Sequence, residues 1–266
     1  CILKYLQSDI KKAISDILDK NQNIVKNADN LSNCVIFKPI FDRKIPVVMT
    51  LHDTGLLCPV AHGWNNKKNT VCLKCKGLNT LPCLINNCVR TKKHLSCLNM
   101  AIWSFINKLT GYNNKINRFI TPSKALADYI KSNNISKVDV IPNFLTDNFL
   151  NKAQFGTNQG YFLYVGTLAD YKGVDILMKA IKELPKEIPF KIIGSGFEEQ
   201  KYKNFVKENH LDNVEFIGNL NREEIIKYYA NCISAIVPSN CFETFGMINL
   251  EAFVSFCQNL KHHAII

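Results

Sequence analysis

Long apolar runs are missing from this 266-residue sequence, in which no stretch reaches the roughly 18 uncharged apolar residues that a membrane-spanning helix needs. The first twenty residues, CILKYLQSDIKKAISDILDK, carry charges throughout, so they predict an amphipathic helix rather than a signal peptide. The chain begins with Cys1 instead of Met, and we expect that its natural N-terminus lies upstream. With 47% hydrophobic residues, a soluble cytoplasmic protein with two domain cores is expected.

Acidic residues are absent between Asp53 and Asp128, where eleven Lys and Arg residues stand. Residues 1–142 hold 21 Lys or Arg and 8 Asp or Glu, hence +13, whereas residues 143–266 hold 12 and 14, hence −2. One interpretation is a lysine-rich, solvated surface. The other is a face for an anionic partner, meaning phosphates, nucleic acid or the acidic lipid at the inner face of a membrane.

An export signal is also missing, so the eleven cysteines predict reduced thiols rather than a disulfide scaffold. The segment VCLKCKGLNTLPCLINNCV contains Cys72-x2-Cys75 and Cys83-x4-Cys88, which is near the spacing of four-thiolate zinc sites. A structural zinc site with these four ligands is one interpretation, and a set of semi-buried reduced thiols is the other.

Nucleic-acid binding by a zinc knuckle is a rival hypothesis, because Lys and Arg surround these cysteines. Proteins that bind single strands usually interleave aromatic residues for base stacking. Residues 64–97 contain only Trp64, so the sequence argues against a nucleic-acid partner.

Short apolar runs alternate with helical patterns along the second half of the chain. The runs are YFLYVG (161–166), FKIIG (190–194), VEFIG (214–218) and ISAIVP (233–238), and PVVMTL (46–51), RFIT (118–121) and VDVI (138–141) repeat the theme. This alternation predicts an α/β protein with two Rossmann-like parallel-sheet domains that face a cleft. The expected divisions are a first domain (1–143) with a Cys-rich insertion (58–97), a linker (144–158), a second domain (159–254) and an atypical tail (255–266).

The turns after these strands are the expected binding positions, because open α/β sheets bind ligands at the carboxyl ends of their strands. After YFLYVG, the turn GTLADYKG brings Lys172 and a helix N-terminus to the sheet edge, which together suit a diphosphate. After FKIIG, Gly194 allows close approach of another group to the backbone. A strand-ending glycine without a ligand role is the alternative.

The stretch CFETFGMINLE contains two glutamates eight positions apart. If a helix begins near Phe245, Glu243 lies in the loop before it and Glu251 about two turns along it. A carboxylate is costly to bury without partners, so hydroxyl or ammonium donors should meet both side chains. A capping role for Glu243 and an ion pair for Glu251 is the alternative interpretation.

ETFGMINLE resembles the E-x7-E signature of the group 1 (family four) retaining glycosyltransferases, which have the two-domain GT-B fold. YVGTLADYKGVDILMKAI, FKIIGSGFEEQ and VEFIGNLNREEIIKYYANC look like three successive units of this family. In the first half, VVMTLHDTGLLCP, RFITPSKAL and VIPNF look like further segments of it. The order and spacing of these segments make the resemblance specific.

The resemblance implies a role for each matching residue. Glu243 would face the donor sugar near the reacting carbon, and His52 would reach that sugar from the first domain. The implied donor-binding positions are Lys172 for the diphosphate, Glu251 for the ribose hydroxyls, the backbone N–H groups of Phe245, Gly246 and Met247, and the strand-end residues Gly166, Thr167 and Gly194.

The implied reaction transfers a hexosyl group from a nucleotide-sugar to an acceptor hydroxyl with retention of configuration. The acceptor would be a carbohydrate or a lipid-linked molecule. Negative charge grows on the leaving diphosphate, and Lys172 with helix N-termini can stabilise it, so no catalytic metal or other cofactor is expected.

Three positions depart from the family pattern. The family commonly has Arg where this chain has Thr167, its first strand and Gly-rich loop have no counterpart, and AFVSFCQNLKHHAII has no Gly or Pro. We therefore expect both domains to be incomplete, with a truncation or frame shift near Ala252. An inactive remnant of a glycosyltransferase is the resulting alternative to an active enzyme.

Overall fold

The computed structural model describes residues 40–86, 88, 94–152, 159–257 and 264–265. The amphipathic helix predicted over the first twenty residues lies outside them. The chain divides into two compact units, Cys1–Pro142 and Asn143–Ile266, and each is described separately.

Unit 1 contains a three-stranded parallel sheet with the strand order β1-β4-β5. Helix α6 is amphipathic and buries Leu126, Ala127 and Ile130, and its N-cap Ser123 accepts a hydrogen bond from the Leu126 N–H at 3.2 Å. The described elements are β1 (Val48–Thr50), β2 (Trp64–Asn65), β3 (Thr70–Val71), α3 (Leu81–Ile85), α4 (His94–Leu109), α5 (Tyr112–Lys115), β4 (Arg118–Thr121), α6 (Lys124–Lys131) and β5 (Val138–Val140).

Unit 2 contains a five-stranded parallel sheet with the strand order β10-β9-β6-β7-β8. Its described elements are α7 (Asp147–Lys152), β6 (Phe162–Val165), the 3₁₀ turn η1 (Asp170–Lys172), α8 (Val174–Glu183), β7 (Phe190–Ile193), α9 (Glu199–Glu208), β8 (Val214–Gly218), α10 (Arg222–Asn231), β9 (Ser234–Ala235), α11 (Met247–Cys257) and β10 (Ala264–Ile265). Helix α7 falls within the linker predicted over residues 144–158, where the sequence shows no sustained period.

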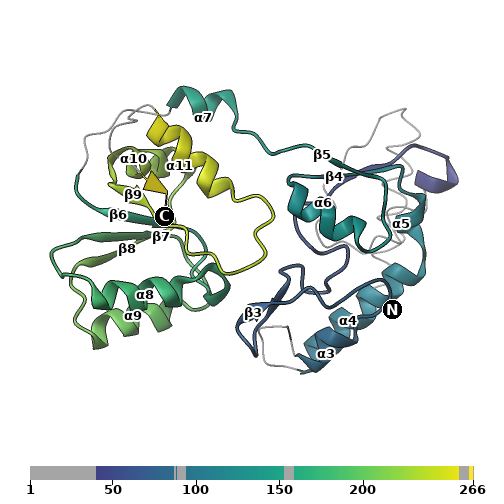
Figure 1. The fold of residues 1–266 in the computed structure, drawn as a ribbon, viewed down its shortest axis with the longest axis horizontal. Coiled ribbons are helices and arrows are strands. Elements are labelled where there is room, and N and C mark those ends of the chain that lie inside the picture. The colour runs from purple at the N-terminus through teal and green to yellow at the C-terminus, as the bar shows by residue number, and fades with distance from the viewer. Residues whose placement is uncertain (1–39, 87, 89–93, 153–158, 258–263, 266) are drawn as a thin grey trace, which may run out of the picture. The chain divides into compact units, whose positions relative to one another are not determined.

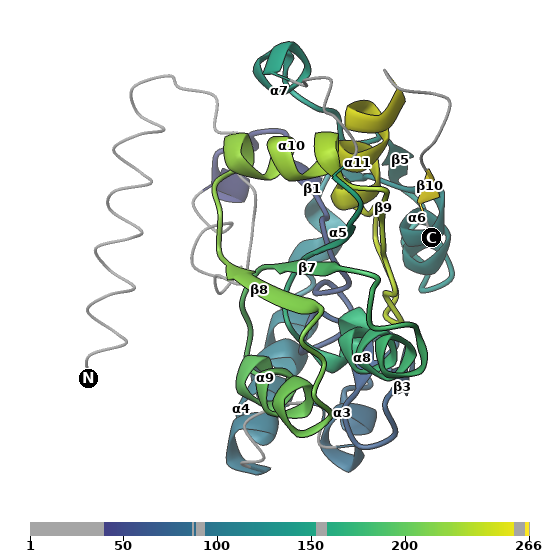
Figure 2. The same ribbon diagram turned by 90° about the vertical axis from the view of Figure 1, so that its left-hand side faces the viewer.

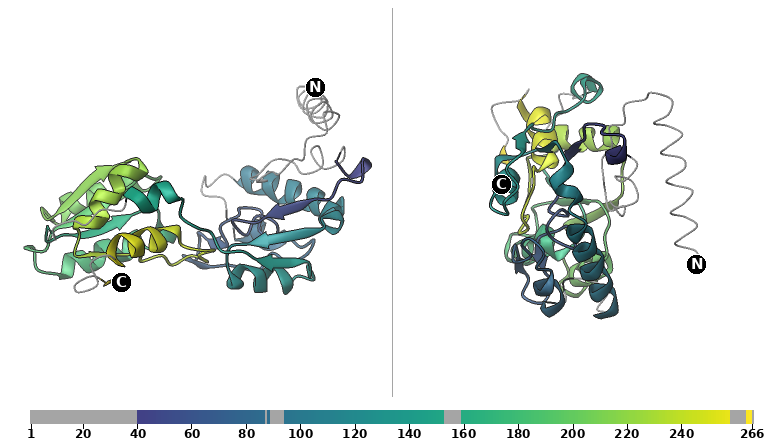
Figure 3. Two further views of the ribbon diagram at one scale, coloured as in Figure 1. Left: turned by 90° about the horizontal axis from the view of Figure 1, so that it is seen from above. Right: turned by 90° about the vertical axis from the view of Figure 1, so that its right-hand side faces the viewer.

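Helices cover both faces of the unit 2 sheet, with α8 and α9 on one face and α10 and α11 on the other (Figures 1 and 2). Figure 3 shows the same layers from two further sides. Alternation along β6 explains the two cores, because Tyr164 packs with α8 residues such as Met178, while Leu163 packs with Tyr229 of α10 and Ala252 of α11. The predicted parallel α/β architecture is thereby confirmed. Within the described residues, no helix combines the length and the apolar character needed to cross a membrane.

Candidate functional site

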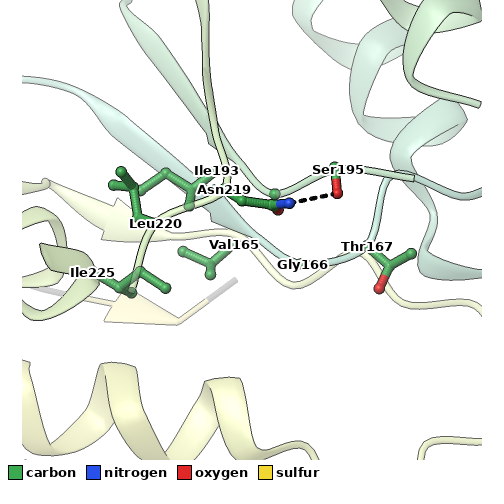
Figure 4. Close-up of a pocket in the computed structure, with 9 residues that line it drawn as sticks. Val165, Gly166, Thr167, Ile193, Ser195, Asn219, Leu220 and Ile225 are labelled. Atoms are coloured by element: carbon green, nitrogen blue, oxygen red, sulfur yellow. Dashed lines mark hydrogen bonds between the residues drawn. The ribbon is translucent and has the colours of Figure 1, made fainter. Parts of the chain in front are cut away.

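A cavity of about 250 Å³ lies at the carboxyl ends of β6, β7 and β8 (Figure 4). Its walls combine aliphatic side chains with a few polar groups, and the Asn219 amide donates a hydrogen bond to the Ser195 hydroxyl at 2.9 Å. The lining residues are Val165, Gly166, Thr167, Ile193, Gly194, Ser195, Asn219, Leu220 and Ile225. Apolar walls with a few placed polar groups are typical of small-molecule sites.

Gly194 is required by the packing of the strand ends themselves. Its φ is +130°, and a Cβ at this position would lie 1.9 Å from the carbonyl oxygen of Gly166. The Gly194 N–H also donates to the Gly218 carbonyl at 2.8 Å. The close approach expected at Gly194 is therefore made by the chain's own backbone, whichever ligand the cavity holds.

The loop before α8 packs closely against the loop before α11 at Gly173. This residue has φ +71°, and a Cβ would lie 1.8 Å from the carbonyl oxygen of Pro238. The Asn240 N–H donates to the Tyr171 carbonyl at 3.2 Å, which fixes the two loops against each other. This contact positions Lys172 beside the segment that contains Glu243.

Lys172 and Glu243 form an ion pair, with 2.7 Å between the lysine Nζ and the glutamate Oε2. Burial disfavours the Lys172 ammonium, but the hydrogen bond and negative charge of Glu243 outweigh burial, so the pKa of Lys172 is raised. The Cys241 thiol also contacts Glu243, at 3.9 Å from the same oxygen. Glu243, the first glutamate of the signature, is therefore in direct contact with Lys172, the residue predicted to bind the diphosphate.

Glu251 lies on α11 with only 7% of its surface exposed. Its Oε1 is 3.4 Å from an Nη of Arg222, the first residue of α10. Burial raises the pKa of Glu251 above its ordinary value, and the Arg222 guanidinium opposes that rise. The second glutamate thus has a cationic partner, as the ion-pair interpretation expects, and its carboxylate lies at the α10 side of the sheet.

The other predicted site residues are placed as follows. His52 is exposed and follows the carboxyl end of β1 in unit 1. Phe245 and Gly246 precede α11, which begins at Met247, two residues later than expected. Gly246 has φ +75°, and its carbonyl accepts a hydrogen bond from the Asn249 N–H at 2.9 Å.

Arg222, Ser195 and Asn219 were missed by sequence reasoning. Arg222 had a usable signal, because Asn221 and Glu224 form a capping box that places residue 222 at the first turn of the helix after β8. For Ser195 and Asn219, the only signal in the sequence was that each follows a predicted strand. Many polar residues share that position, so it does not identify a cavity residue.

The structure does not group the cysteines as their spacing in the sequence predicts. Cys75, Cys83 and Cys88 lie in one buried cluster with Cys58 and Cys97. Cys72 is also buried, but it lies outside this cluster.

A family model described as "Glycosyl transferases group 1" matches residues 146–255. This part of the chain is therefore similar to the group 1 glycosyltransferases. The matched region includes Lys172, Glu243, Glu251 and the whole cavity at the strand ends.

Curated relatives agree with the glycosyltransferase family. An uncharacterized glycosyltransferase of Methanocaldococcus jannaschii is 33% identical over 135 residues, which cover 50% of this chain and 36% of that relative. O-antigen chain mannosyltransferase C of Escherichia coli is 34% identical over 92 residues, which cover 34% of this chain and 24% of that relative. The matches thus span about a third or less of these relatives' own lengths.

Solved glycosyltransferase structures share the fold. Anabaena HepE in complex with UDP matches with a TM-score of 0.59 and 17% identity, over 97% of this chain and 67% of that chain. The lipopolysaccharide outer core galactosyltransferase WaaB matches with a TM-score of 0.55 and 17% identity, over 96% of this chain and 61% of that chain. The chain therefore has the α/β fold of GT-B glycosyltransferases.

Proposed function

We propose that this chain belongs to an enzyme that transfers a hexosyl group from a nucleotide-sugar to an acceptor hydroxyl with retention of configuration. The observation that carries the proposal is the contact between Lys172, in the turn after β6, and Glu243, in the loop after β9. An ammonium next to a carboxylate offers one group for a leaving diphosphate and one for a sugar.

Each residue then has a defined task. Lys172 binds the donor diphosphate and stabilises the negative charge that grows on it during transfer. Glu243 meets the sugar, and Glu251 accepts hydrogen bonds from the ribose hydroxyls. His52 is proposed separately as a sugar-binding residue of unit 1. Because Lys172 and backbone N–H groups serve the leaving group, the proposal requires no catalytic metal or other cofactor.

The names of similar proteins support a nucleotide-sugar donor. The Anabaena protein HepE binds UDP, and the E. coli relative is a mannosyltransferase. For this chain, we infer a nucleoside diphosphate as the part of the donor that the cavity binds, since its walls combine aliphatic side chains with a few polar groups.

The acceptor is inferred to be a carbohydrate or a lipid-linked molecule at an anionic membrane surface. The sequence between Asp53 and Asp128 has no acidic residue and eleven basic ones, and α4 within it exposes several large apolar side chains. These are Leu98, Met100, Ile102, Trp103, Phe105, Ile106 and Leu109. A basic domain with an exposed apolar helix suits the surface of anionic lipid. Co-sedimentation with vesicles that contain anionic lipid, but not with neutral vesicles, is the expected result.

The direct test uses the full natural gene product. Calorimetry with a panel of nucleoside diphosphates should find one that binds. Incubation with the corresponding nucleotide-sugar and a carbohydrate or lipid-linked acceptor should give a glycosylated acceptor and release the nucleoside diphosphate. NMR of the anomeric proton then compares the configuration of donor and product. Binding without transfer would favour an inactive remnant, and inverted product would contradict retention.

A further inference from the structure

Five cysteine thiols form the interior of the segment between β1 and α4. The five are each less than 10% exposed and pack together with Val60, while Leu84 packs partly against them; they are Cys58 (6%), Cys75 (5%), Cys83 (1%), Cys88 (6%) and Cys97 (1%). They come from separate short pieces of chain, so the fold rather than local sequence brings them together.

The sulfur atoms interact with one another. The Cys83 and Cys97 sulfurs are 3.5 Å apart, and the Cys97 thiol donates to the Cys83 carbonyl at 2.9 Å.

Little other structure holds this segment together. Its described elements are the two-residue strands β2 and β3, the five-residue helix α3 and the start of α4. Small folds with little regular structure usually gain stability from a metal or from disulfides. A core made mainly of thiols therefore points to a bond that the thiols themselves make.

One cation lies next to the thiol segment. The Lys108 ammonium is partly buried and donates a hydrogen bond to the carbonyl of Leu57, the residue before Cys58, at 2.7 Å. A metal ion with four thiolates carries net negative charge, and a nearby cation stabilises it.

We propose that Cys58, Cys75, Cys83 and Cys88 together bind one structural zinc ion. Cys97 is left out because its thiol proton is directed at the Cys83 carbonyl, so it remains a hydrogen-bonding neighbour. This set replaces Cys72 of the Cys72-x2-Cys75 pair with Cys58, because Cys72 lies outside the cluster. The inference does not depend on the proposed glycosyl transfer.

Zinc would set the spacing of these sulfurs. Zn–S distances of about 2.3 Å place tetrahedral sulfurs about 3.8 Å from one another. Within the described residues, no group of three or more His, Cys, Asp or Glu side chains is arranged to hold a metal ion as it stands. The proposal therefore requires that the four thiolates adopt this arrangement when the metal binds, because metal binding is commonly coupled to the final folding of small sites.

The test is the zinc content of the full chain, purified under reducing conditions without chelators and measured by plasma mass spectrometry. About one zinc per chain is expected for the wild type. Cys58→Ser and Cys88→Ser should each lose most of the zinc, whereas Cys72→Ser, the matched control in the same segment, should keep it. Replacement of zinc by Co²⁺ should give the absorption of a tetrahedral four-thiolate site, which Cys58→Ser abolishes.

A second measurement uses only the wild type, so it tests the proposal even if the variants fail to fold. Thiol titration under native conditions should show four additional reactive cysteines after a strong chelator removes the metal. Absence of zinc from the wild type, or disulfides among these cysteines in protein with trapped thiols, would overturn the proposal. Loss of zinc in Cys72→Ser with retention in Cys58→Ser would overturn the proposed set of ligands.

Discussion

The Nζ of Lys172 lies 2.7 Å from the Oε2 of Glu243, although the two residues are 71 positions apart in the chain. The pair joins the turn after β6 to the loop after β9, and both side chains are only partly exposed, 20% for Lys172 and 34% for Glu243. A donor diphosphate would therefore compete with Glu243 for the same ammonium.

Glu243→Gln should slow sugar transfer without weakening nucleotide binding. The substitution removes the carboxylate that competes for Lys172, so we expect nucleoside diphosphate affinity to be unchanged or up to severalfold higher. Transfer should fall by about 100-fold or more, because a charged group at the reacting sugar is lost. Calorimetry and initial rates measure the two effects, and a parallel loss of affinity would show that Glu243 binds the nucleotide.

Lys172→Met should instead weaken nucleotide binding. Hydrogen bonds to charged groups contribute about 1.5–3 kcal/mol, so affinity for a nucleoside diphosphate should fall by about 10- to 100-fold. Lys179→Met is the matched control, because Lys179 lies on α8, the helix that follows Lys172, with a side chain that is 73% exposed. Equal affinities of the two variants would remove Lys172 from the site.

Gly173 can be compared with Gly160, because both glycines have similar positive φ angles of +71° and +78°. Gly160→Ala meets nothing within 4 Å, so it should cost only the backbone strain of about 1–2 kcal/mol. Gly173→Ala adds a clash with the Pro238 carbonyl, so its loss of unfolding free energy should be clearly larger. Urea denaturation of both variants measures the difference, and equal losses would mean that the two loops separate easily.

The sequence was sufficient for the alternating strands and helices from β6 to β9 and for the two glutamates, but not for α7, which lies in the predicted linker, or for β10, which lies in the predicted tail. Alternation along β6 and the apolar face of α8 are local patterns, and a carboxylate within an apolar run signals a partner. Which partner each glutamate meets was not local information. Arg222 and Lys172 reach Glu251 and Glu243 only through the strand order of the folded sheet.

The cysteine segment shows a second limit of local patterns. The Cys72-x2-Cys75 spacing suggested a pair, yet the structure clusters Cys75 with Cys58, which precedes it by 17 positions. Helix α4 was also not predicted, because its exposed apolar residues blur the period that an amphipathic helix shows.

Glu251→Gln should stabilise the protein at neutral pH while weakening nucleotide binding. The pKa of Glu251 is raised in the folded state, so the stability linked to it is complete below its ordinary value of 4.5 and is lost as pH rises through the folded pKa. The variant should therefore unfold at higher urea concentration than the wild type near pH 7, and the two should converge near pH 4.

Nucleotide affinity of the wild type should also depend on the protonation of Glu251. Affinity should fall on acidification, whereas the stability linked to Glu251 rises. Protonation of Glu251 removes an acceptor for the ribose hydroxyls, so affinity should fall on acidification at a pH above 4.5. Glu251→Gln is the control for titration of the diphosphate itself, and Tyr229 and Arg222 are the other titratable groups near this carboxylate. Identical pH profiles for the two proteins would exclude the ribose role.

Thr167→Arg should strengthen donor binding, because this position lines the cavity and the family commonly has Arg there. A guanidinium can bind phosphate oxygens with two parallel hydrogen bonds, whereas the threonine hydroxyl carries no charge. We expect about a tenfold gain in nucleoside diphosphate affinity at low salt, and a smaller gain as salt screens the charge. Thr167→Lys adds the same charge without the planar fork, so it should give a smaller gain. If neither variant changes affinity in calorimetry, the diphosphate does not lie at the end of β6.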